Sequence, residues 1–346
     1  MVNSKKEISN PFATGGGGVL FETHVQASFV VLMLATGFVP CFPSYPIKKI
    51  VLQGKHLGYD TDDLIVFVEN PSDGQEKKLL AQVKHSIAIT EGDSVFGEVI
   101  QAAWNDFNNP KIFTKGSDSI ALITGPLSAT DINHVRTILE WARSCGNSEE
   151  FFRNVEQTNF SSEQKRGKLK AFQSQLIKSN GGRDIPKEDI FQFLRHFHLL
   201  GYDLDIKTGV TLSLLHSLIG QYSQNDARII WARIIDEVQF TNQNAGSITI
   251  SSLPHDIQES FKKQIFETIP TNLSKTLAPL DTQDWNRSPY ASELAVVNLL
   301  GSWSENSDTD KLIVSQLSKE DYEKWIPKIQ EILQIPGSPI SLKNGA

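Results

Sequence analysis

The sequence predicts an α/β core followed by a mainly α-helical region. Up to about residue 130, short apolar runs bounded by turn residues alternate with segments of helical periodicity. Beyond about residue 131, long amphipathic segments dominate. The length of 346 residues is enough for about two domains, at roughly 100–200 residues per domain. Strands that alternate with helices are typical of a sheet covered by helices.

The composition restricts the class of protein. The 33 Lys and Arg against 40 Asp and Glu give a formal net charge of −7, so the chain is not a uniformly basic nucleic-acid binder and any basic face is local. The two cysteines, Cys41 and Cys145, are too few for a four-cysteine zinc site and suggest no disulfide framework. We therefore expect a reducing, cytoplasmic location.

The N-terminal segment predicts a buried helix and no membrane contact. Residues 1–18 lack the apolar stretch of a signal peptide and end in four glycines, which predict a flexible segment. From Val19, apolar residues recur mostly every three or four positions, and Gly37 and Pro40 end this expected helix. The most apolar run, residues 29–39, is shorter than the ~20 residues of a membrane span.

The strands of the core are expected in the next hundred residues. Residues 70–74 read Asn-Pro-Ser-Asp-Gly, all turn formers, so residues 64–83 predict a β-hairpin. The expected strands are 47–53, 64–68, 78–83 and 119–123, with a helix over 93–107.

The second half is expected to be mainly helical. The predicted helical segments are 131–145, 148–157, 161–179, 187–199, 210–220, 225–238, 255–267 and 318–334. Residues 165–195 carry eight Lys and Arg against three acids, a candidate DNA-facing surface. Residues 281–331 carry ten acids against five bases, a solvated or partner-facing surface. Ordinary solvated helix faces are the alternative for both.

The hairpin predicts a cluster of polar side chains at one end. Pairing the two strands about the middle of the turn sets Asp63 opposite Val83 or Lys84. Side chains alternate along a strand, so Gln82 and Lys84 share one face and converge with Asp63. A carboxylate and an amide oxygen suit Mg²⁺, which prefers oxygen ligands and keeps several waters. A lysine beside this metal can polarise an attacking water or neutralise charge on a phosphorus centre.

These residues carry a resemblance to a known family. Asp63-x18-Gln82-Val83-Lys84 resembles the D-(x)n-(E/Q)-x-K signature of the PD-(D/E)XK nuclease superfamily, and Glu22, within GGGGVLFETHV, resembles the acidic residue of its first core helix. The fuller pattern is similar to the double-strand DNA endonuclease domain of bacterial anti-phage systems, both in nucleases of cyclic-oligonucleotide signalling and at the N-terminus of STAND-type ATPases. It comprises GGGG..FE, TDDLIVFV, QVKHS, AAWNDF and SIALITGPLS, over about residues 10–130.

The resemblance implies a fold and a domain organisation. The fold would be a restriction-endonuclease-like core with a mixed central sheet flanked by helices. We expect this nuclease core over residues 1–130, a helical extension of it over 131–225, and a helical linker region over 226–346. The tail IPGSPISLKNG resembles the segment before the ATPase module of STAND-type proteins. The resemblance thus implies a C-terminal ATPase or sensor module that is missing here. It also implies that the protein lies in the cytoplasm of a bacterium.

The resemblance also implies a role for each motif residue. Asp63 would be the main metal ligand, Gln82 would ligate through its side-chain oxygen, and the carbonyl of Val83 would add another ligand. Lys84 would act on the attacking water or on the scissile phosphate. Glu22 would orient the water or complete the metal shell.

Two neighbouring residues are second choices, and one motif residue departs from the usual pattern. Asp62 is the alternative to Asp63, which is preferred because it adjoins the strand directly. His85 points to the face opposite Lys84, where a structural hydrogen bond is expected rather than contact with DNA. Gln82 replaces a carboxylate, so metal affinity should be weaker and the site should depend on assembly or on DNA.

Two functions follow from this sequence. The first is a Mg²⁺-dependent endonuclease, with Mn²⁺ as a substitute, that hydrolyses double-stranded DNA as the effector of an anti-phage protein. Its relatives are activated by oligomerisation, so we expect a homo-oligomer driven by the missing C-terminal region. The alternative is a non-catalytic, nuclease-like module for DNA docking or assembly, which Gln82 favours.

Overall fold

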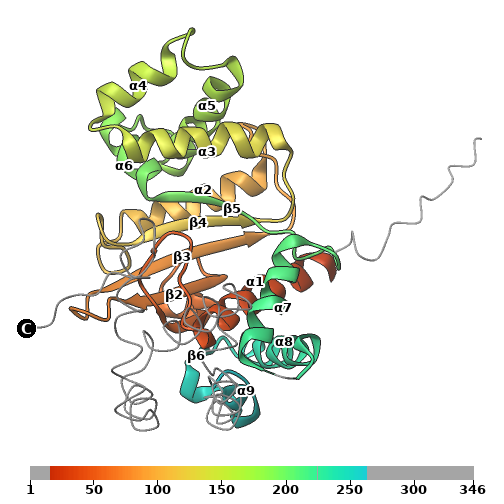
Figure 1. Ribbon diagram of the computed structural model, residues 1–346. Helices are drawn as coiled ribbons and strands as arrows, with labels where there is room; N and C mark the ends of the chain where they lie inside the picture. The colour runs from red at the N-terminus through yellow and green to blue at the C-terminus, as the bar shows by residue number, and fades with distance from the viewer. Residues whose placement is uncertain (1–15, 224, 263–346) are drawn as a thin grey trace, which may run out of the picture. The chain divides into compact units, whose positions relative to one another are not determined.

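The computed structural model describes residues 16–223 and 225–262, and these form a mixed six-stranded sheet between two layers of helices (Figure 1). The strand order is β5-β4-β3-β2-β1-β6. The pairs β3–β4 and β4–β5 are parallel, and the others are antiparallel. The strands are β1 Ile47–Leu52, β2 Leu64–Glu69, β3 Glu76–Lys84, β4 Ser119–Thr124, β5 Phe197–Gly201 and β6 Ser247–Ile248.

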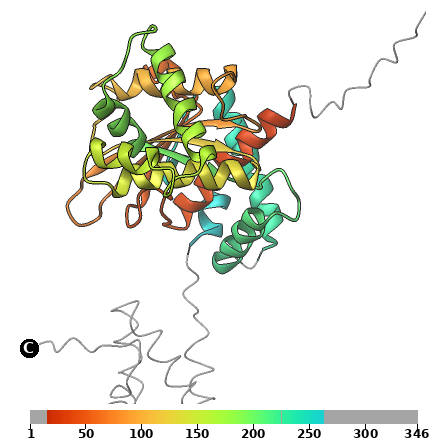
Figure 2. The same ribbon diagram turned by 90° about the horizontal axis from the view of Figure 1, so that it is seen from above.

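Each face of the sheet is covered by its own set of helices, as Figures 1 and 2 show. One layer holds α2 Ser94–Phe107, α3 Ala129–Ser144, α4 Ser148–Glu156, α5 Glu163–Ser179 and α6 Lys187–His196. The other holds α1 Gly16–Leu34, α7 Val210–Tyr222, α8 Ala227–Gln243 and α9 His255–Ser260. Two short 3₁₀ turns, Gly54–Leu57 and Ile250–Ser252, complete the described elements.

The central strands are apolar on both faces because both faces are buried. In β2, Ile65 packs into the cluster with α2 to α6, whereas Leu64 and Val66 pack into the cluster with α1, α7 and α8. All three side chains are fully buried. This arrangement explains the continuous apolar run that predicted the strand.

The expected hairpin is confirmed, but its register differs from the prediction. Leu64 pairs with Ala81 and Glu69 pairs with Glu76, so continuing this register sets Asp63 opposite Gln82 instead of Val83 or Lys84. The loop between the strands is centred earlier than the sequence suggested, because the backbone N–H of Asn70 still bonds to the carbonyl of Gln75 at 2.9 Å.

The helical prediction for residues 187–199 is wrong at its end. Helix α6 stops at His196, and the chain continues as β5, parallel to β4. Phe197 and Leu199 are buried and alternate with less buried neighbours, which is the period of a strand. The sheet therefore draws the first part of β5 from a segment that the sequence suggested as helical, whereas β6 comes from the stretch between the predicted helices 225–238 and 255–267.

The N-terminal helix begins and ends earlier than expected. It starts at Gly16, within the glycine run, and ends at Leu34. Thr36 follows with a left-handed φ of 52°, and the N–H of Gly37 closes the turn on the carbonyl of Leu32. The expected helix over 318–334 and the end of that over 255–267 lie outside the described residues.

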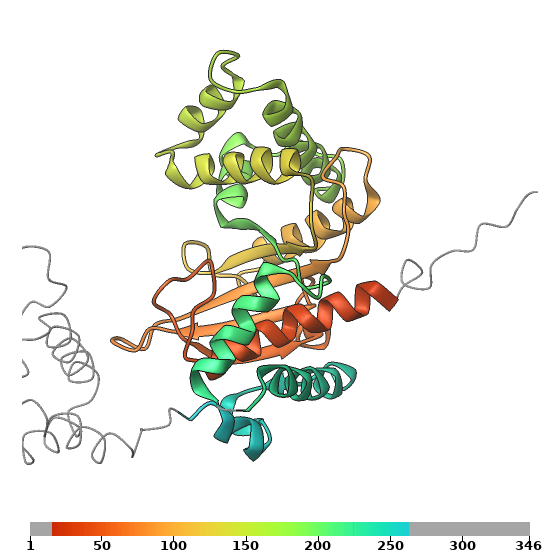
Figure 3. The same cartoon turned by 45° about the vertical axis from the view of Figure 1, so that its right-hand side comes forward.

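Helix α1 is long and apolar enough to cross a membrane by length and composition, and 67% of its apolar window is buried inside the protein. Figure 3 shows it running along the sheet, with α7 and α8 beside it. Phe21, Val25 and Phe29 are almost completely buried in the cluster that this helix forms with the sheet. Helix α1 is thus packed as a core helix.

Candidate functional site

The residues of the sequence motif meet at one end of the sheet. Asp63 directly precedes β2, Gln82 and Lys84 lie in the last part of β3, and Glu22 comes from α1. Val83, between the two β3 residues, faces the α1 layer. Strand alternation therefore turns Gln82 and Lys84 to the other face, as the sequence predicted.

The carboxylate of Asp63 is fixed by the neighbouring strand. Its Oδ2 accepts a hydrogen bond from the backbone N–H of Val83 at 2.7 Å and lies 3.7 Å from Nζ of Lys84. Only 7% of Asp63 is exposed. Burial raises the pKa of this carboxyl, although the charge of Lys84 and the Val83 N–H act in the opposite direction. Side-chain hydrogen bonding from Gln82 also lowers the pKa of Asp63, so the amide belongs to the same cluster.

Glu22 is the most perturbed acid of this cluster. Burial, and then the negative charge of Asp63, raise its pKa to about 7, and the opposing contribution of Lys84 is smaller. Its Oε1 accepts hydrogen bonds from the side-chain amides of Gln53 at 2.7 Å and Gln26 at 2.9 Å. The site therefore concentrates negative charge where water solvates it poorly.

The two second-choice residues lie beside this cluster. The backbone carbonyl of Asp62 accepts a hydrogen bond from the backbone N–H of Gly54 at 2.8 Å. The carboxylate that contacts Lys84 is that of Asp63, the preferred residue of the two. His85 lies on the opposite face from Lys84, with its ring edge-on to Phe21 and its Nε2 3.3 Å from Oδ2 of Asp205.

Three amide residues around Glu22 were missed by the sequence analysis. Gln26 lies one helical turn after Glu22, a spacing at which side chains on a helix meet, so it could have been found. Gln53, in the loop after β1, and Asn242, near the end of α8, both contact Glu22. Asn242 is 220 residues from Glu22 along the chain, and no local pattern indicates the contact.

The oxygen donors of the cluster fit a hard divalent cation. They are the carboxylates of Glu22 and Asp63 and the amide oxygen of Gln82. Within residues 16–223 and 225–262, no three His, Cys, Asp or Glu side chains gather in a way that could hold a metal ion. Two carboxylates and an amide can nevertheless suffice for Mg²⁺, which keeps several waters. A cation would also stabilise the charged form of Glu22, whose pKa is raised by burial and then by the negative charge of Asp63.

The basic run over residues 165–195 is largely engaged within the protein. Lys168 pairs with Asp131, Lys170 lies 3.1 Å from Glu91, and Lys187 lies 3.4 Å from Glu156. Lys165 lies over the ring of Trp141, and Arg195 over that of Phe191. These contacts favour the solvated-face interpretation over a DNA-facing surface.

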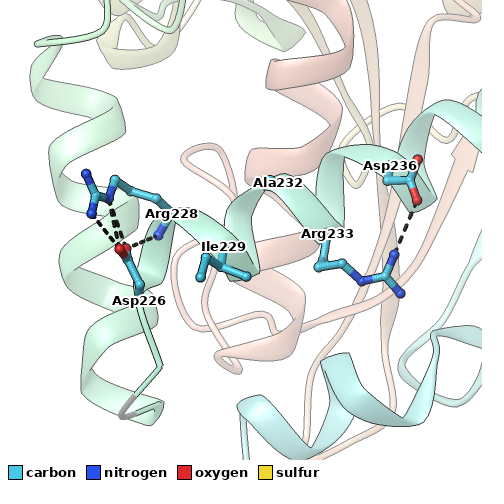
Figure 4. A pocket seen from close by; sticks show the side chains of 6 residues that line it. All are labelled: Asp226, Arg228, Ile229, Ala232, Arg233 and Asp236. Carbon is cyan, nitrogen blue, oxygen red and sulfur yellow. Dashed lines mark hydrogen bonds and ion pairs between the residues drawn. The ribbon is translucent and has the colours of Figure 1, made fainter.

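Two surface hollows in the described part of the chain lie away from the motif. One follows α8 and is flanked by the Arg228–Asp226 and Arg233–Asp236 ion pairs, with Ile229 62% exposed (Figure 4). The other is lined by Lys187 and residues of α4. No candidate site residue lines either hollow. The motif cluster, at the end of the central strands β2 and β3, is separate from both hollows.

Comparison with known proteins finds similarity at the level of solved structures. No protein-family model and no curated protein matches the chain. The chain is similar to the Cap4 SAVED/CARF-domain containing receptor of Acinetobacter baumannii, solved with the cyclic trinucleotide 3'3'3'-cAAA. The TM-score is 0.40 at 11% identity, over 74% of this chain and 49% of that one. It is also similar to the Cap4 receptor of Moraxella osloensis, with a TM-score of 0.37 at 12% identity, over 71% of this chain and 49% of the other. The chain spans about half the length of these receptors.

Proposed function

We propose that the chain is a Mg²⁺-dependent endonuclease with a restriction-endonuclease-like core that hydrolyses double-stranded DNA. The observation that carries this proposal is the contact of Lys84 with Asp63 at the end of the hairpin, with Glu22 and Gln82 in the same cluster. These residues resemble the nuclease signature, with Gln82 in the place of the usual second carboxylate and Glu22 as the acid from the first helix. The setting we propose, anti-phage defence, follows from the resemblance of the sequence pattern.

The roles of the side chains follow from their chemistry. Asp63, Gln82, Glu22 and the carbonyl of Val83 would hold Mg²⁺. The ion, when bound, supplies positive charge against the charge that develops on the phosphate and makes a bound water more acidic. Lys84 neutralises charge on the non-bridging oxygens and directs the attacking water, since its ammonium group is held beside Asp63. Glu22 orients that water from the side of α1.

Self-association is part of the proposal. Residues 41–90 hold six lysines and six acids, so the segment around the site attracts a DNA backbone only weakly. Several copies on one duplex would bind more tightly, because each further contact is intramolecular. We therefore propose that a homo-oligomer is the active form.

Plasmid cleavage tests the proposal. The full chain is incubated with supercoiled plasmid and Mg²⁺ or Mn²⁺ over a wide range of protein concentrations, beside Lys84→Ala. Lys48→Ala is the matched control, because this β1 lysine is exposed and pairs with Glu69, away from the motif. We expect metal-dependent cleavage that rises steeply with protein concentration, disappears in Lys84→Ala and persists in Lys48→Ala.

Two results would contradict the proposal. Equal cleavage by wild type and Lys84→Ala would place the active site elsewhere. DNA binding that survives both Asp63→Asn and Lys84→Ala, with no cleavage at any concentration, would favour the docking or assembly module instead.

A further inference from the structure

The carboxylate of Glu22 is held by three side-chain amides from three separate segments. Its Oε1 accepts from Gln26 of the same helix at 2.9 Å, from Gln53 after β1 at 2.7 Å, and from Asn242 of α8 at 3.4 Å. We call Gln26, Gln53 and Asn242 the amide clamp. Three donors on one oxygen leave the orientation of this carboxylate little freedom.

The orientation of Gln26 is determined by its surroundings. Its Nε2 lies against three acceptors: Oε1 of Glu22, the backbone carbonyl of Asp63 at 2.9 Å, and Oδ1 of Asn242 at 3.4 Å. A flipped amide would set its oxygen against all three, so only the observed orientation is favourable. Gln26 is fully buried and thereby links Glu22 to the backbone of Asp63.

This orientation has a cost in stability. The Oε1 atom of Gln26 is buried and has no hydrogen-bond partner in the described part of the chain. A buried acceptor left unpaired costs about 1–3 kcal/mol. The amide of Gln26 therefore donates from Nε2 to Glu22 and Asp63 while its Oε1 stays unpaired. Such an unpaired buried acceptor is more typical of functional sites than of an ordinary core.

Gln53 is held in a strained backbone conformation. Its φ of 52° and ψ of 54° lie in the left-handed region, which non-glycine residues rarely adopt. The next residue, Gly54, passes so close to Ile65 that a Cβ would lie 2.3 Å from its Cδ1. The loop therefore packs closely against β2, and the Gln53 side chain points at Glu22. A left-handed backbone at a non-glycine residue persists only where the surrounding structure enforces it.

Asn242 reaches the site because α8 leads back to the sheet edge. The turn after α8 is tied to β1 by the bond from the Leu52 N–H to the carbonyl of Gly246 at 3.0 Å, and β6 then pairs with β1 through Ile50 and Ile248. Leu52 immediately precedes Gln53. One junction therefore positions both of the long-range members of the amide clamp.

We propose that Gln53 and Asn242 are positioning residues that fix the Glu22 carboxylate for the metal and its water, so that α8 and β6 are part of the catalytic unit. This inference rests on the proposed function, and it assigns a role to a segment that lies far from the signature motif. Residues that orient a metal ligand typically change metal affinity or activity by about 10–100-fold when they are replaced.

Mn²⁺ binding to the full chain, measured by titration calorimetry, tests the inference without requiring cleavage. Asn242→Leu and Gln53→Met keep the size of each side chain and remove its amide, and we expect each to weaken Mn²⁺ binding about 10-fold or more. Gln243→Leu is the matched control, because Gln243 is the next residue on α8 and is exposed. It should bind Mn²⁺ as the wild type does.

A double-mutant cycle separates positioning from a general structural effect. In a Glu22→Ala background the amides have no carboxylate to hold, so adding Asn242→Leu should change the Mn²⁺ affinity less than about 2-fold. An equal loss in both backgrounds would show that Asn242 acts only through the fold and would overturn the inference.

The failure of the inference and the failure of the proposed function are distinguishable. Mn²⁺ binding by the wild type, equalled by Asn242→Leu and Gln53→Met, would overturn the amide clamp and leave the nuclease proposal intact. A wild type that neither binds Mn²⁺ nor cleaves plasmid would overturn both.

Discussion

Asp106 illustrates how one side chain positions the loop that leads to the site. Its buried carboxylate accepts hydrogen bonds from the backbone N–H of Thr61 at 2.7 Å and from that of Asp60 at 3.0 Å. Burial raises the pKa of this carboxyl, and the two N–H bonds counteract the shift. The bonds fix the chain two residues before Asp63.

Removing this carboxylate should destabilise the protein. We expect Asp106→Ala to lower the free energy of unfolding by about 2–4 kcal/mol, because an unpaired buried N–H costs about 1–3 kcal/mol. Urea unfolding measures the change. Glu98→Ala, at an exposed position of the same helix, is the control, and an equal effect of the two variants would refute this role of Asp106.

His198 predicts a pH dependence of stability. Burial, assisted by the charge of Arg143, lowers its pKa from 6.5 to about 3. Below pH 6.5 the histidine is protonated in the unfolded chain, whereas in the folded chain it stays neutral down to about pH 3. The free energy of unfolding therefore decreases as the pH falls from 6.5 to about 3.

Replacing His198 should reduce that loss. Between pH 6.5 and pH 5 the histidine accounts for about 1.5 kcal/mol of the fall in unfolding free energy, because the slope rises to its full value of about 1.36 kcal/mol per pH unit only well below pH 6.5. Urea unfolding of His198→Gln at both pH values should show a shallower fall than wild type. A wild-type slope for His198→Gln would contradict the assignment.

How much of the site the sequence reveals depends on distance along the chain. Asp63, Gln82 and Lys84 belong to one hairpin, so strand alternation alone brings them together. Gln53 and Asn242 reach Glu22 only through the tertiary fold, and a single sequence carries no local signal for such a contact.

At the scale of elements, the strands with continuous apolar runs were predictable and β5 was not. Residues 187–194 have helical spacing, and the His and Leu residues that follow read as a further turn of the same helix. Only the neighbouring edge of β4 selects the extended form, since β5 pairs along its whole length with that strand. Tertiary pairing here overrides local preference.

The end of β4 packs directly against the residue that follows Lys84. A Cβ on Gly125 would lie 2.5 Å from the backbone carbonyl oxygen of His85, closer than atoms can approach. Substitution would displace this backbone and with it the contact of Lys84 with Asp63. The close packing of β3 and β4 thus helps to set the geometry of the site.

We therefore expect Gly125→Ala to reduce cleavage about 10–100-fold, since small misplacements of reacting groups have effects of this size. Plasmid cleavage at a fixed Mg²⁺ concentration measures the change. Gly220→Ala on α7, where a Cβ meets nothing within 4 Å, should retain full activity. Equal activity of the two variants would exclude this link between β4 and Lys84.

At the scale of the whole molecule, charge argues for assembly. The chain carries a formal net charge of −7, and several of its basic side chains are engaged in ion pairs. Attraction to the DNA backbone is therefore weak in a single copy, and avidity offers the physical means of strengthening it.

Forced assembly should lower the protein concentration that cleavage requires. We expect a trimeric coiled coil fused after residue 346 to lower the concentration for half-maximal plasmid cleavage about 10–100-fold or more. The same fusion with proline substitutions that keep the coil monomeric is the control. Identical concentration dependence of the two fusions would contradict activation by assembly.

The most direct test of the account is Mn²⁺ binding to the wild type and to Asp63→Asn, with and without a duplex oligonucleotide. The account predicts one Mn²⁺ per chain in the wild type, bound more tightly with duplex present, and loss of that site in Asp63→Asn. Binding that is unchanged in Asp63→Asn, or no binding to the wild type in either condition, would contradict a metal-dependent nuclease site at the end of this hairpin.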